Sequence, residues 1–589
     1  METKRRSILV SLLKYTKGQL WLYFIGLMLM LFIVVCDLLV PIFTSMSLKY
    51  LGEEVINFDA ILLLVIVGVI VMVIQSIARY AQTMILNYAG HRITLSIRDV
   101  VLCHIQSLSH EQLNNIPVGK LVTRVTSDVN VLWNMYTNVI LSLITNAFTI
   151  IGVFIAMFIL NDKLALILLI IVPVIAVFTY VFRYYSRRVH RVVRDNVSNM
   201  NAFLSENLSG MKIIQVFNQE EKKYQEFVDN NNQLKRSSLK EIFVFGIFRP
   251  SVYVLYITSV ILVLWFGGNE AIEVNLGILT VGITYDVLYA FYQYVSRFFN
   301  PIQALADQFN ELQSAFASAE KIFSILDIQP QIVDSEDAID LELTGDIEFK
   351  DVWFSYIPGE WVLKGVSFHI KANQTVAFVG KTGSGKTTIL SLIVRNYDIQ
   401  KGQILIDGVD IKKIKISCLR KQFGQMLQDV FLFSGNVFNN IQMYDEKITI
   451  EDVMEACKYV NADRFISKLP NGYYEPVRER GNNFSLGQRQ LISFARAIVH
   501  KPKIMILDEA TANIDTESEV LIQDSLKKIM NNGTVLVVAH RLSTIQHADN
   551  IIVFHNGNII EEGNHQSLLK QKGRYHKLYM LQFAKENKK

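Results

Sequence analysis

Cysteine is scarce in this sequence of 589 residues. The four cysteines, Cys36, Cys103, Cys418 and Cys457, are scattered, and no two of them form a C-x-x-C pair. This pattern argues against a cysteine metal site and against a disulfide framework, and it fits a reducing cytosol for the soluble part. A concentrated basic patch is also lacking, because the residues behind the net charge of +4 are spread among loops. We therefore expect no nucleic-acid partner.

A cleavable signal peptide is not expected either. Lys4, Arg5 and Arg6 precede an apolar run, as in a signal peptide. However, the run Leu20–Phe43 is too long for the apolar core of such a peptide, and no small-residue cleavage site follows it. The pattern predicts a retained membrane span.

Long apolar runs dominate the first half of the chain, before about residue 302. Crossing a bilayer takes roughly 20 helical residues. Six segments reach this length, which predicts a six-span domain embedded in a lipid bilayer. They are Leu20–Phe43, Ala60–Leu86, Trp133–Leu160, Leu164–Phe182, Phe243–Phe266 and Ile278–Phe299.

The loops between these segments alternate in length and charge. Asn87–Leu132 and Arg183–Ile242 are long and polar, and the second is rich in Lys and Arg, whereas the short loops carry only Lys49 and Lys163. The positive-inside rule places the N-terminus, both long loops and the C-terminus in the cytoplasm. We predict a multi-pass protein of the cytoplasmic membrane whose helices continue well beyond the bilayer.

The segment Gly380–Thr387 fits the phosphate-loop pattern G-x-x-x-x-G-K-[ST]. A predicted buried strand, Thr375–Val379, precedes it, and a predicted helix follows. In such a loop, backbone N–H groups and the helix N-terminus face a phosphate chain. Lys386 would reach the β- and γ-phosphates, and Thr387 would hold Mg²⁺. The predicted phosphate-binding residues are Gly380, Lys381, Thr382, Gly383, Ser384, Gly385, Lys386, Thr387 and Thr388.

A second half of this site is indicated by Lys503–Glu509, an apolar strand that ends in two acids. Asp508 would lie at the carboxyl end of a parallel sheet near Mg²⁺, and Glu509 would polarise an attacking water. Such a strand is common on its own. About 120 residues after a phosphate loop, it is a much stronger indication of ATP or GTP hydrolysis.

Between these two motifs lies Asn483–Gln490, which resembles the Leu-Ser-Gly-Gly-Gln signature of ATP-binding cassette (ABC) transporters. The resemblance extends through most of the chain. Gly119–Asp128 and Glu206–Gly210 resemble the two coupling loops of ABC exporters. The sequence is similar to a bacterial exporter half-transporter of the multidrug type.

This resemblance assigns roles to individual residues. It implies ATP and Mg²⁺ as ligands, Tyr356 stacked on adenine, Asp515 at a dimer interface, and Lys386, Glu509 and His540 as catalytic residues. It also implies that Ser485, Leu486, Gly487 and Gln488 face the ATP bound by a second chain. The implied Mg²⁺ ligands are Thr387, Gln428 and Asp508.

The fold implied is an α-helical membrane domain of the type I/type IV ABC exporter fold, with six transmembrane helices, fused to an α/β P-loop nucleotide-binding domain. We expect the membrane domain at 1–325, an acidic linker at 326–344 and the nucleotide-binding domain at 345–589. The implied function is ATP-driven export of amphipathic small molecules by alternating access. A lipid flippase, a peptide exporter and an ATP-gated protein without transport stay open as alternatives.

One motif departs from the family pattern. The signature has Phe484 where the family has leucine and Leu486 where it has glycine. A bulky side chain at a close approach of backbone to phosphate weakens such a site. Because Lys386 and Glu509 are intact, the pattern resembles one chain of a heterodimeric exporter. A homodimer that tolerates leucine is the alternative.

Ionisable residues inside apolar spans usually face a cavity or a partner. Asp37 and Asp286 lie within the first and sixth spans, and Tyr289 and Tyr292 follow on the sixth. These four residues could line a substrate cavity for amphipathic cations. Alternatively, the aromatic residues only pack, and an acid pairs with a nearby arginine.

Overall fold

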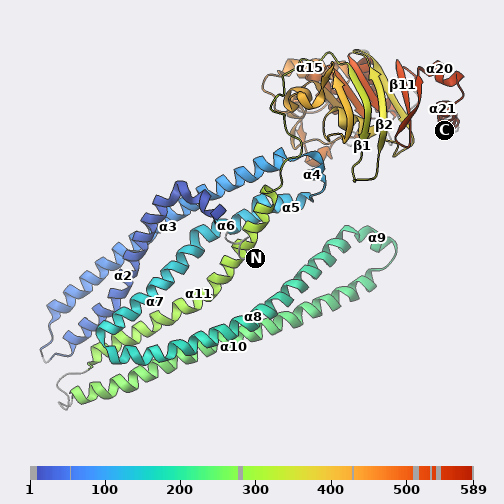
Figure 1. The fold of residues 1–589 in the computed structure, drawn as a ribbon. Coiled ribbons are helices and arrows are strands. Elements are labelled where there is room, and N and C mark those ends of the chain that lie inside the picture. The colour runs from blue at the N-terminus through green and yellow to red at the C-terminus, as the bar shows by residue number, and fades with distance from the viewer. Residues whose placement is uncertain are drawn as a thin grey trace. The chain divides into compact units, whose positions relative to one another are not determined.

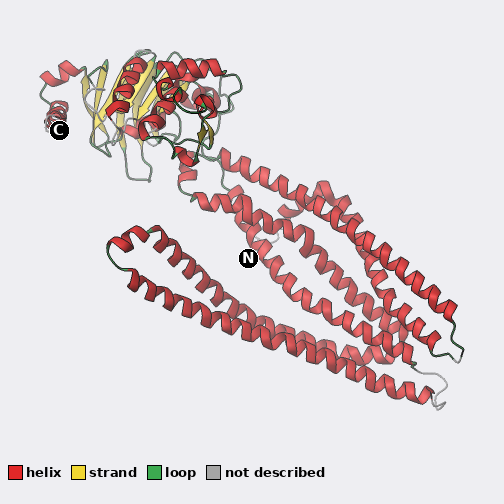
Figure 2. Cartoon of the chain, turned by 180° about the vertical axis from the view of Figure 1, so that it is seen from behind, coloured by secondary structure: helices red, strands yellow, loops and turns green. Residues whose placement is uncertain are grey.

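The structure, a computed structural model of the 589-residue chain, describes residues 10–53, 55–275, 283–426, 430–508, 516–530, 533–538 and 546–586. The chain divides into two compact units. The first comprises Met1–Gln106 and Val118–Ile328, and the second comprises Ser107–Pro117 and Gln329–Lys589. The first unit is helical, and the strands lie in the second (Figure 2).

Long helices make up the first unit (Figure 1). Their bounds are α2 (Leu20–Leu51), α3 (Phe58–Ser107), α7 (Ile140–Leu160), α8 (Asp162–Ser209), α10 (Glu220–Asn275) and α11 (Tyr285–Leu326). Among the described residues, five helical segments are long and apolar enough to cross a membrane: Val10–Leu51, Phe58–Ser107, Val118–Leu160, Asp162–Ser209 and Glu220–Glu273.

The sixth expected span differs from the other five. Its first residues, 278–282, lie outside the described residues, and most of the rest belongs to α11, which is not among the five apolar segments. The start of α11 is rich in tyrosine, and its buried face packs against protein: Ala290, Phe291, Tyr294 and Val295 are fully buried in the core of the helical unit. The Tyr294 hydroxyl donates to the Leu38 carbonyl of α2 at 2.6 Å.

The helices extend far beyond their apolar segments, as expected from the long loops. α8 and α10 run side by side as a long hairpin, with the short helix α9 (Met211–Val216) at its tip (Figure 1). Between α3 and α7, the short helices α5 (Val118–Thr123) and α6 (Val129–Asn134) alternate with two π-helical turns, Arg124–Asp128 and Met135–Val139. Such turns mark local irregularities in an otherwise continuous helix.

A buried carboxylate joins the first π-helical turn to α11. Asp128 is 7% exposed. It pairs with Arg124 on its own turn, accepts a hydrogen bond from Ser318 Oγ at 2.9 Å, and lies 3.9 Å from Lys321 Nζ. The negative charge of Asp128 thus lies close to the positive charges of Arg124 and Lys321. It links two segments almost 200 residues apart in sequence.

The second unit is an α/β domain with two main sheets (Figure 1). An antiparallel sheet has the strand order β2-β1-β4-β5 and comprises Leu363–Ile370, Ile347–Phe354, Lys401–Ile406 and Val409–Asp410. The larger sheet has the order β12-β11-β3-β10-β9-β6 and comprises Asn558–Gly563, Asn550–His555, Thr375–Gly380, Thr534–Val538, Ile504–Asp508 and Phe423–Met426. In the larger sheet β3, β6, β9, β10 and β11 pair in parallel.

Helices cover this larger sheet and complete two apolar cores. They are α12 (Lys386–Ile393), α13 (Ile416–Lys421), α14 (Val437–Gln442), α15 (Ile450–Tyr459), α16 (Asp463–Ile466), α17 (Leu486–Val499), α18 (Thr516–Met530), α20 (His565–Lys570) and α21 (Arg574–Glu586). β3, β9 and β10 are buried along nearly their whole length, which explains their continuous apolar sequence.

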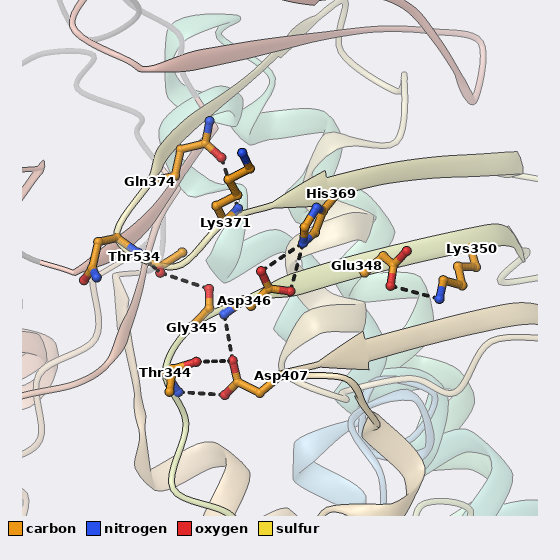
Figure 3. A network of polar contacts seen from close by, with 11 residues as sticks. Thr344, Gly345, Asp346, Glu348, Lys350, His369, Lys371, Gln374, Asp407 and Thr534 are labelled. Carbon is orange, nitrogen blue, oxygen red and sulfur yellow. Dashed lines mark hydrogen bonds and ion pairs between the residues drawn. The ribbon is translucent and has the colours of Figure 1, made fainter.

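A polar network fixes the point where the chain enters the first strand of this domain (Figure 3). The Asp407 carboxylate accepts hydrogen bonds from the Thr344 and Asp346 backbone N–H groups and from the Thr344 hydroxyl. Thr534 Oγ1, at the start of β10, donates to the Gly345 carbonyl at 2.9 Å. These contacts tie the start of β1 to both sheets.

The helix α4 (His110–Asn114), which follows α3 in the chain, belongs to the second unit. Its Gln112 Nε2 donates to the Gln329 carbonyl at 2.7 Å, and Ser109 Oγ lies 3.2 Å from Gln331 Oε1. The predicted first coupling loop, Gly119–Asp128, lies instead in the helical unit. Ser107–Pro117, directly before the predicted coupling loop, therefore belongs to the same compact unit as the nucleotide-binding domain.

Replacing Asp128 by alanine should destabilise the helical unit. Removing one partner of a buried ion pair typically costs about 3–5 kcal/mol, because the other charge stays buried without compensation. The apparent melting temperature of the detergent-purified protein should fall clearly. The exposed Asp99→Ala on α3 is the control, with an expected change within about 0.5 kcal/mol. Equal melting temperatures for both variants would contradict the assigned role of Asp128.

Candidate nucleotide site

The phosphate loop lies between β3 and α12, as the sequence predicts. Its three glycines have positive φ angles, +159° at Gly380, +81° at Gly383 and +105° at Gly385. A Cβ atom at Gly385 would lie 2.8 Å from Leu363 Cδ2, so only glycine fits this turn. The loop ends at Lys386, the first residue of α12. The strand, turn and helix N-terminus together form the arrangement that binds phosphate.

The Lys386 ammonium lies inside this loop. Its Nζ donates to the Gly380 carbonyl at 2.8 Å and to the Lys381 carbonyl at 3.1 Å, and the residue is 5% exposed. Burial lowers the pKa of Lys386, and the Asp508 carboxylate opposes this shift. A buried cation next to loop N–H groups is suited to phosphate oxygens.

Ser384 supplies a second observation that fits a phosphate ligand. This residue is 4% exposed, and among the described residues its Oγ has no hydrogen-bond partner. A buried hydroxyl without a partner is costly unless a ligand or water satisfies it. The neighbouring Thr387, one residue into α12, is exposed.

Asp508 ends β9, and the parallel sheet explains its position. β10 pairs in parallel with both β3 and β9, and Asp508 is in register with Val538. The carboxyl ends of β3 and β9 therefore lie at one edge of the sheet, which brings the phosphate loop and Asp508 to the same region. A carboxylate and a threonine hydroxyl are suitable Mg²⁺ ligands. Gln428, Glu509, Asp515 and His540 lie outside the described residues.

Tyr356 lies beside the N-terminal turn of α12. Its hydroxyl donates to Thr388 Oγ1 at 3.1 Å, and the residue is 42% exposed. The Tyr397 ring packs edge-on against Tyr356 at 5.2 Å between centroids, and His110 of α4 packs edge-on against Tyr397 at 6.1 Å. Tyr397 thus connects the predicted adenine-stacking residue to α4. No sequence motif includes Tyr397, so its position beside Tyr356 is visible only in the structure.

The signature residues form the start of α17. Ser485 is the N-cap, its Oγ accepts from the Gln488 backbone N–H, and the Gln488 side chain accepts from the Ser485 N–H. Phe484 is 6% exposed and packs against Phe465, so its departure from the family pattern serves the core. Ser485 is exposed, and Leu486, the first residue of the helix, is partly exposed. Gly487 is buried.

The two acids among the candidate cavity residues have different partners. Asp37 lies 3.4 Å from Arg79 and 3.8 Å from Arg297, measured from carboxylate oxygen to guanidinium nitrogen. Asp286 accepts a hydrogen bond from Ser45 Oγ at 3.2 Å. Asp37 therefore pairs with arginines, as expected if the acids of the spans serve packing and do not line a cavity.

The two tyrosines are exposed on α11, 44% for Tyr289 and 42% for Tyr292. Tyr289 lines a groove of about 570 Å³ together with residues of α2 and α3, and this lining does not include Asp37, Asp286 or Tyr292. A common cavity of the four residues stays a prediction.

A helical membrane unit and a P-loop α/β unit in one chain define an ATP-dependent membrane transporter. Comparison with protein families identifies the family: the model described as ABC transporter transmembrane region matches residues 23–296, and the model described as ABC transporter matches residues 363–512. The chain belongs to the ABC transporters, with the membrane and ATP-hydrolysing parts of an exporter half-transporter fused. This confirms the expected fold class and ATP as ligand.

Relatives cover most of the chain. A Bacillus subtilis protein named probable multidrug resistance ABC transporter ATP-binding/permease protein YheH is 38% identical over 86% of this chain and 74% of its own length. The putative ABC transporter ATP-binding protein exp8 of Streptococcus pneumoniae is 34% identical over 98% and 97%. An ATP-dependent lipid A-core flippase of Syntrophus aciditrophicus is 34% identical over 94% and 92%.

Replacing Tyr356 by leucine should weaken ATP binding on the order of tenfold, as expected for loss of base stacking. Equilibrium ATP binding to the purified protein measures this. Tyr356→Phe is the matched control: it keeps the ring and loses only the hydrogen bond to Thr388, so its affinity should stay close to that of the parent. Unchanged affinity in the leucine variant would show that Tyr356 does not contact the base.

Proposed function

We propose that the chain exports amphipathic small molecules across the cytoplasmic membrane by alternating access, as one half of a dimer. The observation that carries this proposal is the intact Lys386 and Asp508 half-site in a chain that also contains the membrane domain. The basic residues of the long loops support cytoplasmic termini and a cytoplasmic nucleotide site. The name of the Bacillus subtilis relative supports the multidrug class.

In this proposal, each residue of the half-site has a defined task. Lys386 and the loop N–H groups hold the β- and γ-phosphates of ATP, and Tyr356 holds the base. Thr387, Gln428 and Asp508 would hold Mg²⁺, which would supply positive charge beside the transferred phosphoryl group. Glu509 orients the attacking water, and His540 contacts the γ-phosphate. Asp515 contributes to the interface with the second chain.

The second chain completes the site. The exposed Ser485, at the N-terminus of α17, supports a role in contacting ATP held by another chain, together with Gly487 and Gln488. ATP then holds two nucleotide-binding domains together, and hydrolysis releases them. The contacts of α4 with Gln329 and Gln331 offer a route by which this movement reaches α3.

We favour a heterodimer with a second ABC half-transporter. Leu486 is partly exposed at the helix terminus that would face the ATP of the second chain, where the family has glycine. Its side chain would keep backbone N–H groups away from phosphate. The site built from this chain's Lys386 and Glu509 would remain active, and the other would be weakened. A homodimer is the alternative.

The class of substrate has two candidates. The aromatic residues of α11 suit amphipathic cations. However, Asp37 is paired with two arginines, which weakens that argument. A lipid substrate is the second candidate, supported by the name of the flippase relative. A peptide exporter stays an alternative. An ATP-gated protein without transport is less favoured, because such a protein has no need of a water-orienting Glu509.

ATP turnover by this chain purified alone in lipid tests the heterodimer. We expect background turnover for the lone chain and full turnover after co-expression with a second half-transporter. Glu509→Gln in the co-expressed complex should abolish turnover and leave ATP binding intact. Robust turnover by the lone chain, lost in Glu509→Gln, would establish a homodimer. Hydrolysis unaffected by Glu509→Gln would refute the assignment of the base.

Replacing Leu486 by glycine tests the weakened signature directly. In the lone chain, glycine restores close approach of the α17 N-terminus to phosphate in any homodimer that forms. Turnover should rise at least about tenfold, the effect of one regained hydrogen bond to a charged group. Leu486→Ile is the matched control and should change little. Equal turnover of parent, Gly and Ile variants would contradict a limiting role for Leu486.

A further inference from the structure

An apolar cavity of about 410 Å³ lies in the helical unit, between α7, α8, α10 and α11. Its volume is within the range of ligand pockets. Most of its lining is aliphatic or aromatic, including Ile175 and Phe182 of α8, Phe245 of α10 and Phe298 of α11. The Arg187 side chain of α8 also lines it. The cavity thus combines an apolar interior with a guanidinium group.

Arg187 also lines a second, adjoining hollow of about 680 Å³ on the surface of α8. The other residues of this hollow are Tyr180, Tyr184, Arg188, Arg191 and Val192. We call Arg187, Arg188 and Arg191 the arginine cluster. Because Arg187 lines both spaces, an apolar cavity and a basic surface meet at one side chain.

The positive charge of the arginine cluster is not neutralised within the described part of the chain. None of its three guanidinium groups lies within 4.0 Å of a described carboxylate, and this includes Asp307 of α11, which also lines the cavity. A neighbouring residue of α8 does have an acidic partner on α10: His190 Nδ1 lies 2.6 Å from Glu241 Oε1. The three residues of the cluster are exposed.

The position of the cluster along α8 points to the membrane surface. The apolar stretch of α8 ends at Phe182, and the cluster begins five residues later. Tyr180 and Tyr184 lie at this boundary and are 74% and 64% exposed. Exposed tyrosines are typical of the level of lipid headgroups, and arginines directly beyond an apolar helix are typical of contact with anionic lipids.

We propose that the arginine cluster and the adjoining cavity form a binding site for an anionic phospholipid of the surrounding bilayer. The lipid phosphate is held by Arg187, Arg188 and Arg191, whose planar guanidinium groups suit phosphate oxygens. An acyl chain enters the apolar cavity beside Arg187. The site is separate from the nucleotide site and is independent of which molecule the protein exports.

Quenching of a single tryptophan by brominated lipids tests this site in the full-length protein without nucleotide, after its five native tryptophans have been replaced by phenylalanine. Tyr185→Trp places the reporter beside the hollow, where Tyr185 packs against Tyr184. The protein is reconstituted with brominated phosphatidylglycerol or brominated phosphatidylcholine. We expect a preference for phosphatidylglycerol that falls on the order of tenfold or more in the triple variant Arg187→Gln, Arg188→Gln, Arg191→Gln.

A matched control removes the same charge elsewhere on the hairpin. Arg194→Gln, Lys212→Gln and Lys222→Gln together should keep the preference for phosphatidylglycerol. Equal quenching by phosphatidylcholine in all proteins confirms that the helices remain folded at the same depth.

Three outcomes would overturn the proposal. An equal loss of preference in both triple variants would indicate a general charge effect. Displacement of phosphatidylglycerol by inorganic phosphate would indicate a phosphate site without lipid. Absence of quenching by either lipid would indicate that a second protein chain covers Tyr185.

Discussion

The parallel pairing of β10 with β3 and β9 is the constraint on which the nucleotide site depends. It brings the carboxyl ends of two strands more than 120 residues apart in sequence to one edge of the sheet. The phosphate loop follows one strand, and Asp508 ends the other. Without this register, Lys386 would be a buried cation without an acid nearby, and the turn with positive φ at Gly383 and Gly385 would have no ligand to enclose.

The same unit includes a short piece of chain, α4, which lies in sequence between two segments of the helical unit. α4 is fixed by the capping box of Ser109 and by side-chain contacts to Gln329 and Gln331. The Tyr397 ring lies between Tyr356 and His110, so a base stacked on Tyr356 would be only two aromatic contacts away from α4. This packing gives a physical reason why occupation of the nucleotide site and the position of α4 can depend on each other.

In the helical unit, charge is either neutralised between helices or concentrated at a surface. Asp37 pairs with Arg79 and Arg297, and Asp128 pairs with Arg124 and contacts α11. The arginine cluster on α8 has no such compensation among the described residues. Since an uncompensated charge is costly near hydrocarbon, the paired acids contribute to helix packing, and the unpaired arginines are suited to a ligand from outside the chain.

The sequence by itself was sufficient for the fold class, the family and the phosphate loop, because these depend on local patterns: apolar runs of spanning length, and glycines at positions where φ is positive. It also predicted Asp508, because an apolar strand that ends in an acid is a local pattern. Tertiary structure alone decided which charges are paired, that α4 belongs to the same compact unit as the nucleotide-binding domain, and that Tyr397 lies beside Tyr356. It also decided that Phe484 is a core residue while Leu486 stays partly exposed. These features depend on which distant segments pack together, and hydrophobic pattern and motif spacing do not specify such contacts.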